Sequence, residues 1–404
     1  MLDEDIHPII DDFGFEENNE ILYAVAKIAN KVVEDVASRY IDPILKSLNG
    51  IRGALNIAVF NGGRDDFASI LAVDSTWTKP FVELVVGDIA VISTGYVIVA
   101  PAGIGSHGIS YIALRRSSIN ESSFNDDVEL DAKIMEFLTA RKKMAKAVDV
   151  VMLDGSLYFS TTPEFFDPLD SVDVIKAKSR LSGPKLASLA STTLIKMLRE
   201  ADASSIPVVG VVKRVSSRFL LPILSNAGLK DVEDVLIKTN DKLLMSFTLR
   251  SGEYVVFNSY LEMLKQYLSY EIRKYIKIKR ARKVLEILEK CYSTENTLLQ
   301  ELCSYMDNTA ILFYKHLGDS VYPQAIRLDV YPRKAVEKVV SYVMYNTSHN
   351  CVPIPIDYVD RYIRLESSFV KKIYRILKAY TKNIETSIAL SPTNPQKYYL
   401  FESM

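Results

Sequence analysis

The stretch from residue 67 to residue 215 limits the possible folds most, because its apolar patterns change type in a fixed order. Residues 67–103 are rich in β-branched and aromatic residues with turn breaks, which predicts at least three strands joined by short turns. The rest alternates, with a helix predicted over 127–147, a strand over 148–157, a helix over 183–202 and a strand over 206–215. Antiparallel hairpins followed by crossover helices are typical of an α/β fold with a mixed sheet.

Two further segments are helical in pattern. Residues 18–48 show apolar positions at helical spacing and predict one or two helices. Residues 258–306 are helical in pattern throughout, and seven Lys or Arg residues lie between Arg273 and Lys283. Such a run is typical either of a solvated helix face or of a nucleic-acid path in which Tyr275 stacks on a base.

The C-terminal part returns to the sheet and then ends in helices. Strands are predicted in residues 309–332, and two prolines further on predict an extended entry into a long helix that starts near Asp357, as its N-cap. The tail after Ser391 predicts an irregular or docked peptide. We therefore expect four segments: a helical arm (1–50), a first core segment (51–257), a basic helical insertion (258–306) and a segment that completes the core and carries the C-terminal helix and tail (307–404).

Composition excludes several classes of protein. The 404 residues are 48% hydrophobic and 25% charged, which describes a globular protein with a large core. The net charge of -1 excludes a uniformly basic coat for nucleic acid, although it allows a local basic groove. Cys291, Cys303 and Cys351 have no CxxC spacing, so neither a disulfide framework nor a zinc site is indicated. The acidic start is no signal peptide and no apolar run could span a bilayer, so we expect a cytoplasmic protein.

Two predicted strands end in a carboxylate. In "VVMLDGSLYFS" the apolar run stops at Asp154, before a Gly and a Ser, and Asp74 closes "ASILAVD" in the same way. One interpretation is a strand-terminating turn, since Asp and Gly both favour turns. The other adds Glu136, on the helix before the second strand, and Asp360, in the late helix. Clustered carboxylates repel one another without a cation, and oxygen ligands suit a hard divalent ion, so this set predicts a metal site.

An ordered set of short motifs resembles the archaeal NurA nucleases. The set consists of "AVDSTWTKP", "VVGDIAVISTGYVIV", "LDGSL", "KR" after a strand, and a late "P-x-P-x-x-x-x-D" before a helix, and it runs from about residue 50 to 370. The resemblance implies an RNase H-like mixed sheet with flanking helices, interrupted here by a helical insertion, and a toroidal homodimer. It implies Mn²⁺-dependent cleavage of single-stranded DNA and of duplex from the 5′ end. It also implies a partner, the hexameric ATPase HerA, in the resection of broken DNA ends.

The resemblance assigns roles to individual residues. The first catalytic aspartate falls on Asp74, the DGS aspartate on Asp154, and the helical glutamate on Glu136, with Glu129 as a competing register. The last metal-site position is a histidine in the family, and here it is Asp360. A carboxylate at that position is expected to shift the preference from Mn²⁺ toward a harder ion such as Mg²⁺. His349 lies nearby in sequence, but an isolated histidine is more often a surface or core residue.

Three further residues are candidates for contact with DNA. Lys213 and Arg214 end a predicted strand and are placed to contact the scissile phosphate in a two-metal hydrolysis, although a strand-end lysine is as often merely solvated. Trp77 is the single tryptophan and is a candidate for stacking on an unpaired base, or for packing in the hairpin core. For Tyr96 we expect packing.

Two other questions stay open at this level. The fold also suits a non-catalytic relative that binds DNA or docks the ATPase, or, less closely, an RNase H-like enzyme that acts on RNA or a DNA/RNA hybrid. The arm carries a broad apolar face, which predicts either a dimer contact, a dock for the ATPase ring, or packing on the protein's own sheet. The face comprises Ile21, Leu22, Val25, Ile28, Val32 and Val36.

Overall fold

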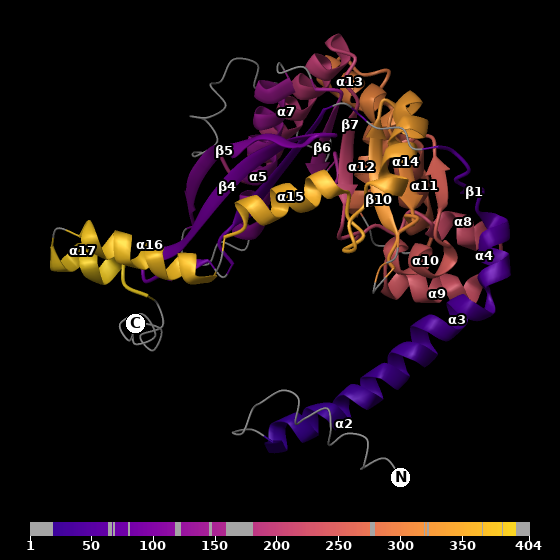
Figure 1. Ribbon diagram of the computed structural model, residues 1–404, viewed down its shortest axis with the longest axis horizontal. Coiled ribbons are helices and arrows are strands. Elements are labelled where there is room, and N and C mark those ends of the chain that lie inside the picture. The colour runs from indigo at the N-terminus through magenta and orange to yellow at the C-terminus, as the bar shows by residue number, and fades with distance from the viewer. Residues whose placement is uncertain are drawn as a thin grey trace.

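The computed structural model describes residues 19–63, 67, 69–79, 81–117, 123–144, 148–158, 181–274, 279–318, 320, 323–365, 367–381 and 383–392. Within these residues, ten strands form one sheet with helices on both faces (Figure 1). The strands are β1 (Ile57–Val59), β2 (Ile70–Trp77), β3 (Val82–Leu84), β4 (Gly87–Ala100), β5 (Gly103–Arg116), β6 (Val150–Asp154), β7 (Val208–Val212), β8 (Glu253–Phe257), β9 (Ala310–Tyr314) and β10 (Ile326–Tyr331).

The helices lie before, between and after these strands. The first half of the chain holds α2 (Asn19–Val36), the π-helical segment η1 (Ala37–Ile41), α3 (Asp42–Lys46), α4 (Leu48–Ala54), α5 (Phe124–Met144) and α7 (Gly183–Ala203). The second half holds α8 (Leu221–Asn226), α9 (Lys230–Lys238), α10 (Asp241–Thr248), α11 (Tyr260–Lys274), α12 (Lys279–Glu289), α13 (Thr297–Asp307), the 3₁₀ turn η2 (Arg333–Ala335), α14 (Val336–Tyr345), α15 (Ile354–Ile363), α16 (Ser367–Ala379) and α17 (Ile384–Ala389).

The strand order gives the sheet an RNase H-like core. From one edge the order is β5, β4, β2, β6, β7, in which β4 runs antiparallel to β5, to β2 and to the short β3, while β2, β6 and β7 run parallel. Antiparallel pairing then adds β10, β9, β8 and β1 beyond β7. The mixed α/β sheet predicted from the sequence is confirmed. The parallel strands matter for function, because their carboxyl ends meet at one edge of the sheet.

Alternation along the central strands assigns each side chain to one face. Leu71 and Val73 of β2 pack in the core cluster that contains the apolar side chains of α5 and α7. Ile70 and Ala72 pack in the opposite cluster, with the apolar side chains of α14 and α15. Because successive residues of a strand point to opposite faces, Asp74 continues the second set and faces α15. The same parity in β6, where Met152 belongs to the second set, directs Asp154 to that face.

Some local predictions were wrong, and the late helix is the clearest case. It begins at Ile354, not near Asp357, because Pro353 takes the N-cap position and Pro355 fits the first turn. Asp357 instead lies inside the first turn and pairs with Arg361. The helix also ends at Ile363, and α16 is a separate element. Neither β5 nor β8 was predicted.

The segments at and beyond the core keep their helical character. Helix α2 leaves the body as a single extended helix (Figure 1), and Val25, Ile28 and Val32 on it are 53%, 61% and 53% exposed. Helices α11, α12 and α13 lie between β8 and β9, and their apolar side chains join the main core cluster. The division into four segments stays a prediction. No helix among the described residues is long and apolar enough to cross a membrane. Tyr275 and the tail beyond residue 392 lie outside the described residues.

Candidate active site

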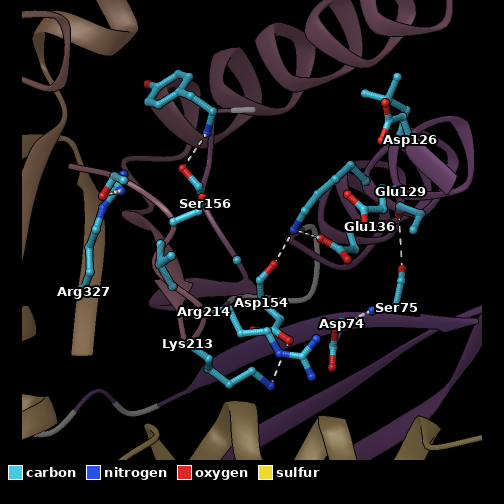
Figure 2. Close-up of a pocket in the computed structure, with 18 of the residues that line it drawn as sticks. Asp74, Ser75, Asp126, Glu129, Glu136, Asp154, Ser156, Lys213, Arg214 and Arg327 are labelled. Carbon is cyan, nitrogen blue, oxygen red and sulfur yellow. Dashed lines mark hydrogen bonds and ion pairs between the residues drawn. The ribbon is translucent and has the colours of Figure 1, made fainter. Parts of the chain in front are cut away.

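The register of the parallel strands brings the two strand-end aspartates together. Val73 of β2 pairs with Leu153 of β6, so the residues that follow them, Asp74 and Asp154, are neighbours at the same edge of the sheet. Both face α15 by the parity of their strands. The two carboxylates therefore lie close together at the carboxyl ends of β2 and β6 (Figure 2).

Helix α5 adds Glu136 and, unexpectedly, Lys133. Lys133 Nζ lies 2.7 Å from Glu136 Oε2 and also donates to the backbone carbonyl of Asp154 (Figure 2). Gly155 allows this contact, because its φ of +88° suits glycine, and an added Cβ would lie 3.0 Å from Lys133 Nζ. Gly210 on β7 leaves room for the Gly155 backbone, because an added Cβ at residue 210 would lie 2.8 Å from the Gly155 carbonyl oxygen. The turn interpretation of "DGS" is therefore confirmed, and the metal-site interpretation stays a prediction.

Lys213 and Asp360 complete the cluster from β7 and α15. Lys213 Nζ lies 2.8 Å from Asp154 Oδ2 and 3.8 Å from Asp360 Oδ2. Asp360 remains 56% exposed, whereas Asp74 is only 4% exposed. We call Asp74, Glu136, Asp154 and Asp360 the carboxylate cluster.

The carboxylate cluster carries more negative charge than its counter-ions balance. Burial raises the pKa of Asp74 well above its ordinary value, and the charges of Asp154 and Glu136 raise it further, against the opposing effect of Lys213. Burial also raises the pKa of Glu136, to about 7, although Lys133 opposes this shift. Among the described side chains, four carboxylates face two ammonium groups here. The site therefore favours an added cation.

The chemistry of these donors fits a divalent metal ion, but the side chains are not arranged as the ligands of a single ion. Among the described residues, no group of three or more His, Cys, Asp or Glu side chains is arranged around a single ion. The ammonium groups of Lys133 and Lys213 lie between the carboxylates instead. Carboxylate oxygens are the ligands that hard cations prefer, and their mutual repulsion is relieved by such an ion. An ion shared by Asp154 and Asp360 would therefore displace the ammonium group of Lys213.

All the sequence-predicted site residues line one cavity of about 1150 Å³. They are Asp74, Trp77, Glu136, Asp154, Lys213, Arg214 and Asp360. Glu129 also lines the cavity, but it is exposed and its carboxylate accepts a hydrogen bond from Asn125, one turn away on the same helix. Glu136 is 3% exposed and electrostatically coupled to Asp154, which favours it over Glu129.

Other candidates fall outside the cluster or were missed. Trp77 is partly buried, with Lys79 Nζ 4.4 Å from its ring centroid, and Tyr96 packs in the core. His349 is exposed and is not part of the cavity wall. Sequence reasoning missed Lys133 because a Lys three residues before a Glu is an ordinary pair on a helix surface. It also missed Arg327, a charged residue in the middle of a buried strand.

An RNase H-like sheet with a carboxylate cluster at the ends of its parallel strands defines the class of protein, which is a metal-dependent nuclease. A NurA domain model matches residues 68–365, which is most of the chain. The chain therefore belongs to the NurA family of nucleases.

Solved structures agree with this fold. The crystal structure of the NurA nuclease from Sulfolobus solfataricus matches with a TM-score of 0.54 and 13% identity, over 87% of this chain and 96% of that one. A structure of NurA with manganese matches with a TM-score of 0.47 and 9% identity, over 91% and 99% of the two chains. At such low identity the first match supports the fold alone, and the second is too distant to support an argument. No curated protein matches the sequence.

Proposed function

We propose that this protein is a DNA nuclease whose divalent ions are held by Asp74, Glu136, Asp154 and Asp360. The observation that carries the proposal is the charge imbalance in the carboxylate cluster, where four acids, two of them buried, face two bases. Repulsion between clustered acids opposes stability, and a bound cation would relieve it. When bound, divalent ions supply activated water and stabilise the leaving oxygen in phosphodiester hydrolysis.

The chain's own side chains would position the ions and the DNA. Lys133 pairs with Glu136 and donates to the backbone carbonyl of Asp154, so it links α5 to the end of β6. Gly155 makes the turn that allows this contact. Lys213, once released from Asp154 by the ion, would contact the scissile phosphate together with Arg214, which lines the same cavity. Trp77, on the cavity wall, would support an unpaired base.

The proposals for the metal and the substrate rest on membership of the NurA family. Mn²⁺, which the resemblance to the NurA nucleases implies, is the cofactor that we propose, with Mg²⁺ as an alternative ion that Asp360 would help to accept. The substrate would be single-stranded DNA and duplex ends, resected 5′ to 3′ in the repair of double-strand breaks.

The proposed partners are a second copy of the chain and a hexameric HerA-type ATPase. Support comes from α2, whose apolar residues Val25, Ile28 and Val32 are exposed and do not pack on the sheet. A chain that begins at residue 37 tests this role, because it removes α2 but keeps Ile44, which is fully buried in the core. Gel filtration should show loss of the dimer, or a pull-down should show loss of ATPase binding. A truncated chain that keeps both would exclude α2 as the contact.

Digestion of labelled DNA tests the nuclease assignment. Single-stranded and duplex substrates are incubated with Mn²⁺, Mg²⁺ or EDTA, and we expect cleavage with either metal and none with EDTA. Glu136→Gln and Glu129→Gln form a matched pair, because both residues line the cavity on α5 but only Glu136 is coupled to the aspartates. Glu136→Gln should lose cleavage and Glu129→Gln should keep it. Cleavage in EDTA would exclude the mechanism, and the reverse pattern of the pair would move the site to Glu129.

One observation favours a second candidate function, that of a non-catalytic DNA-binding or ATPase-docking subunit. The ammonium groups of Lys133 and Lys213 already lie against three of the carboxylates, as they would in a site that has lost its metal. In that case DNA would bind without metal and would stay intact under every condition of the digestion.

A further inference from the structure

The active-site cavity extends well beyond the carboxylate cluster. Its far wall is built by residues of the loop before α8, of β10 and of α11, and it is mostly apolar and aromatic. We call this part the aromatic lobe, lined by Phe219, Tyr260, Leu264, Tyr267, Leu268 and Arg327. Ser156 lies between the two parts (Figure 2), two residues after Asp154. Its hydroxyl donates to Asp329 on β10.

The rings of the lobe hold one another in fixed orientations. The ring centroids of Phe219 and Tyr260 are 5.6 Å apart, and those of Phe219 and Tyr267 are 5.9 Å apart, both edge to face. The Tyr267 hydroxyl donates to Glu271, which fixes the ring from the side of α11. Phe219 and Tyr260 are nearly buried, whereas Tyr267 is partly exposed, so Tyr267 offers the most open ring of the three.

Arg327 adds a hydrogen-bond donor to this lobe. Its side chain is 3% exposed, its Nε donates to Asp329 Oδ1, and its Nη1 donates to Ser217 Oγ. Its Nη2 lies 2.8 Å from the same Asp329 oxygen and forms an ion pair with it. A guanidinium carries five N–H donors, so after these contacts Arg327 keeps a donor for a further acceptor in the lobe.

We propose that the aromatic lobe binds the base of a nucleotide that flanks the scissile bond, which stacks on Tyr267 and accepts a hydrogen bond from Arg327. This inference rests on the proposed nuclease function. A base fits the lobe better than a phosphate does, because the walls are apolar and the charge of Arg327 is balanced by Asp329. The cavity is also larger than one phosphate and two ions require. Helix α11 of the segment 258–306 then takes part in substrate recognition through its inner face.

Cleavage assays that combine enzyme variants with modified substrates test whether the lobe binds a base. The substrates are single-stranded decamers in which an abasic residue replaces each nucleotide in turn. The enzymes are the full chain, Tyr267→Leu, which keeps apolar bulk without an aromatic face, and Tyr267→Phe, which keeps the ring. With Mn²⁺, the wild type should show a register, besides any that Trp77 supports, at which the abasic residue slows cleavage at least about fivefold, the lower end of what a base–aromatic stack is worth.

Tyr267→Leu should cleave intact DNA more slowly by a similar factor and should show no further loss at that register. Tyr267→Phe should behave as the wild type does. An abasic penalty of the same size in wild type and Tyr267→Leu, or no register-specific penalty, would overturn the lobe while leaving the nuclease intact. If neither the wild type nor the variants cleave DNA, the proposed function fails. Fluorescence anisotropy then gives the dissociation constants of the same decamers, and the comparison of wild type with Tyr267→Leu and Tyr267→Phe tests the lobe alone.

Discussion

Two buried clusters of charge lie on either side of the Ser156 turn, and they are built in opposite ways. In the first, which we call the arginine cluster, Arg327 is accompanied by Asp329 and Asp241. Asp329 accepts from Ser156 Oγ at 2.5 Å and from Arg327 Nε at 2.9 Å. Asp241 accepts from Ser217 Oγ and from the backbone N–H groups of Phe219 and Leu220. Each carboxylate therefore has fixed donors, mostly within the core.

The carboxylate cluster lacks this support. Asp74 accepts a hydrogen bond from the N–H of the next residue, Ser75, while burial and the negative charges of Asp154 and Glu136 raise its pKa. Its balancing charges are two lysine side chains that reach it on long, flexible stems. The comparison teaches that charge is neutralised by rigid donors where it serves stability, and left in excess where it serves a ligand. Substitutions in the two clusters should therefore have opposite effects.

The largest effect is expected from Asp74→Asn. Removal of one carboxylate should lower DNA cleavage at least about a hundredfold, the upper end of what loss of a group that supports a metal site costs. The same change relieves repulsion, so the metal-free variant should melt at or above the temperature of the wild type. Cleavage rates and thermal melts with EDTA check both parts. A variant that melts lower than wild type and cleaves normally would assign Asp74 to stability.

Asp329→Asn should have the reverse pattern. Arg327 would lose its charged partner in a site where Asp329 is fully buried, and breaking such a pair costs about 3–5 kcal/mol of unfolding free energy. Urea denaturation measures the loss, and cleavage per folded molecule should fall much less than in Asp74→Asn. If Asp329→Asn is as stable as wild type, the distinction between the two clusters fails.

Asp241 gives the arginine cluster a pH dependence. Burial raises the pKa of Asp241 from 3.8 to about 6, although its three donors oppose the shift. Because the folded value is the higher one, its contribution to stability is fully present below pH 4 and is lost as the pH rises through about 6. The free energy of unfolding of wild type, measured relative to Asp241→Asn, should fall by roughly 2 kcal/mol between pH 4 and pH 7. A difference that does not change with pH would contradict the raised pKa.

Asp360 should show the smallest effect, because it is half exposed and reaches the cluster only through Lys213. Asp360→His should move the preference from Mg²⁺ toward Mn²⁺ while cleavage continues, since imidazole is a softer ligand than carboxylate. Asp360→Ala should weaken activity with both ions. The ratio of cleavage rates in the two metals is the measurement. An unchanged ratio in both variants would leave Asp360 as an exposed residue in the last turn of its helix, without a role in metal binding.

The carboxylate cluster could be predicted from the sequence because its signals are local. Apolar runs that end in Asp74 and Asp154 identify strand ends, and parallel strands bring such ends together. Glu136 follows from a helix that returns directly into the next strand. The roles of Lys133 and Lys213 as counter-ions could not be predicted, because they depend on distances between elements.

The arginine cluster and the aromatic lobe could not be predicted for a related reason. Their members come from β10, α10, α11 and the loop before α8, which are far apart in the chain. One signal was available, since "IRLDVY" places Arg327 and Asp329 two residues apart on one face of an otherwise apolar strand. The position of the late helix was misjudged because Asp357 is a good N-cap residue, but Pro353 ends the extended segment first.

The central claim, that the carboxylate cluster is a site for divalent metal, is tested most directly by titration calorimetry with Mn²⁺ in the absence of DNA. Wild type and Glu129→Gln should both bind Mn²⁺ saturably, with stepwise heats for more than one ion where two are held. Asp154→Asn should lose most of that binding, because Asp154 lies at the centre of the cluster, next to Asp74 and against Lys213. No saturable binding to wild type, or equal binding to wild type and Asp154→Asn, would contradict the claim.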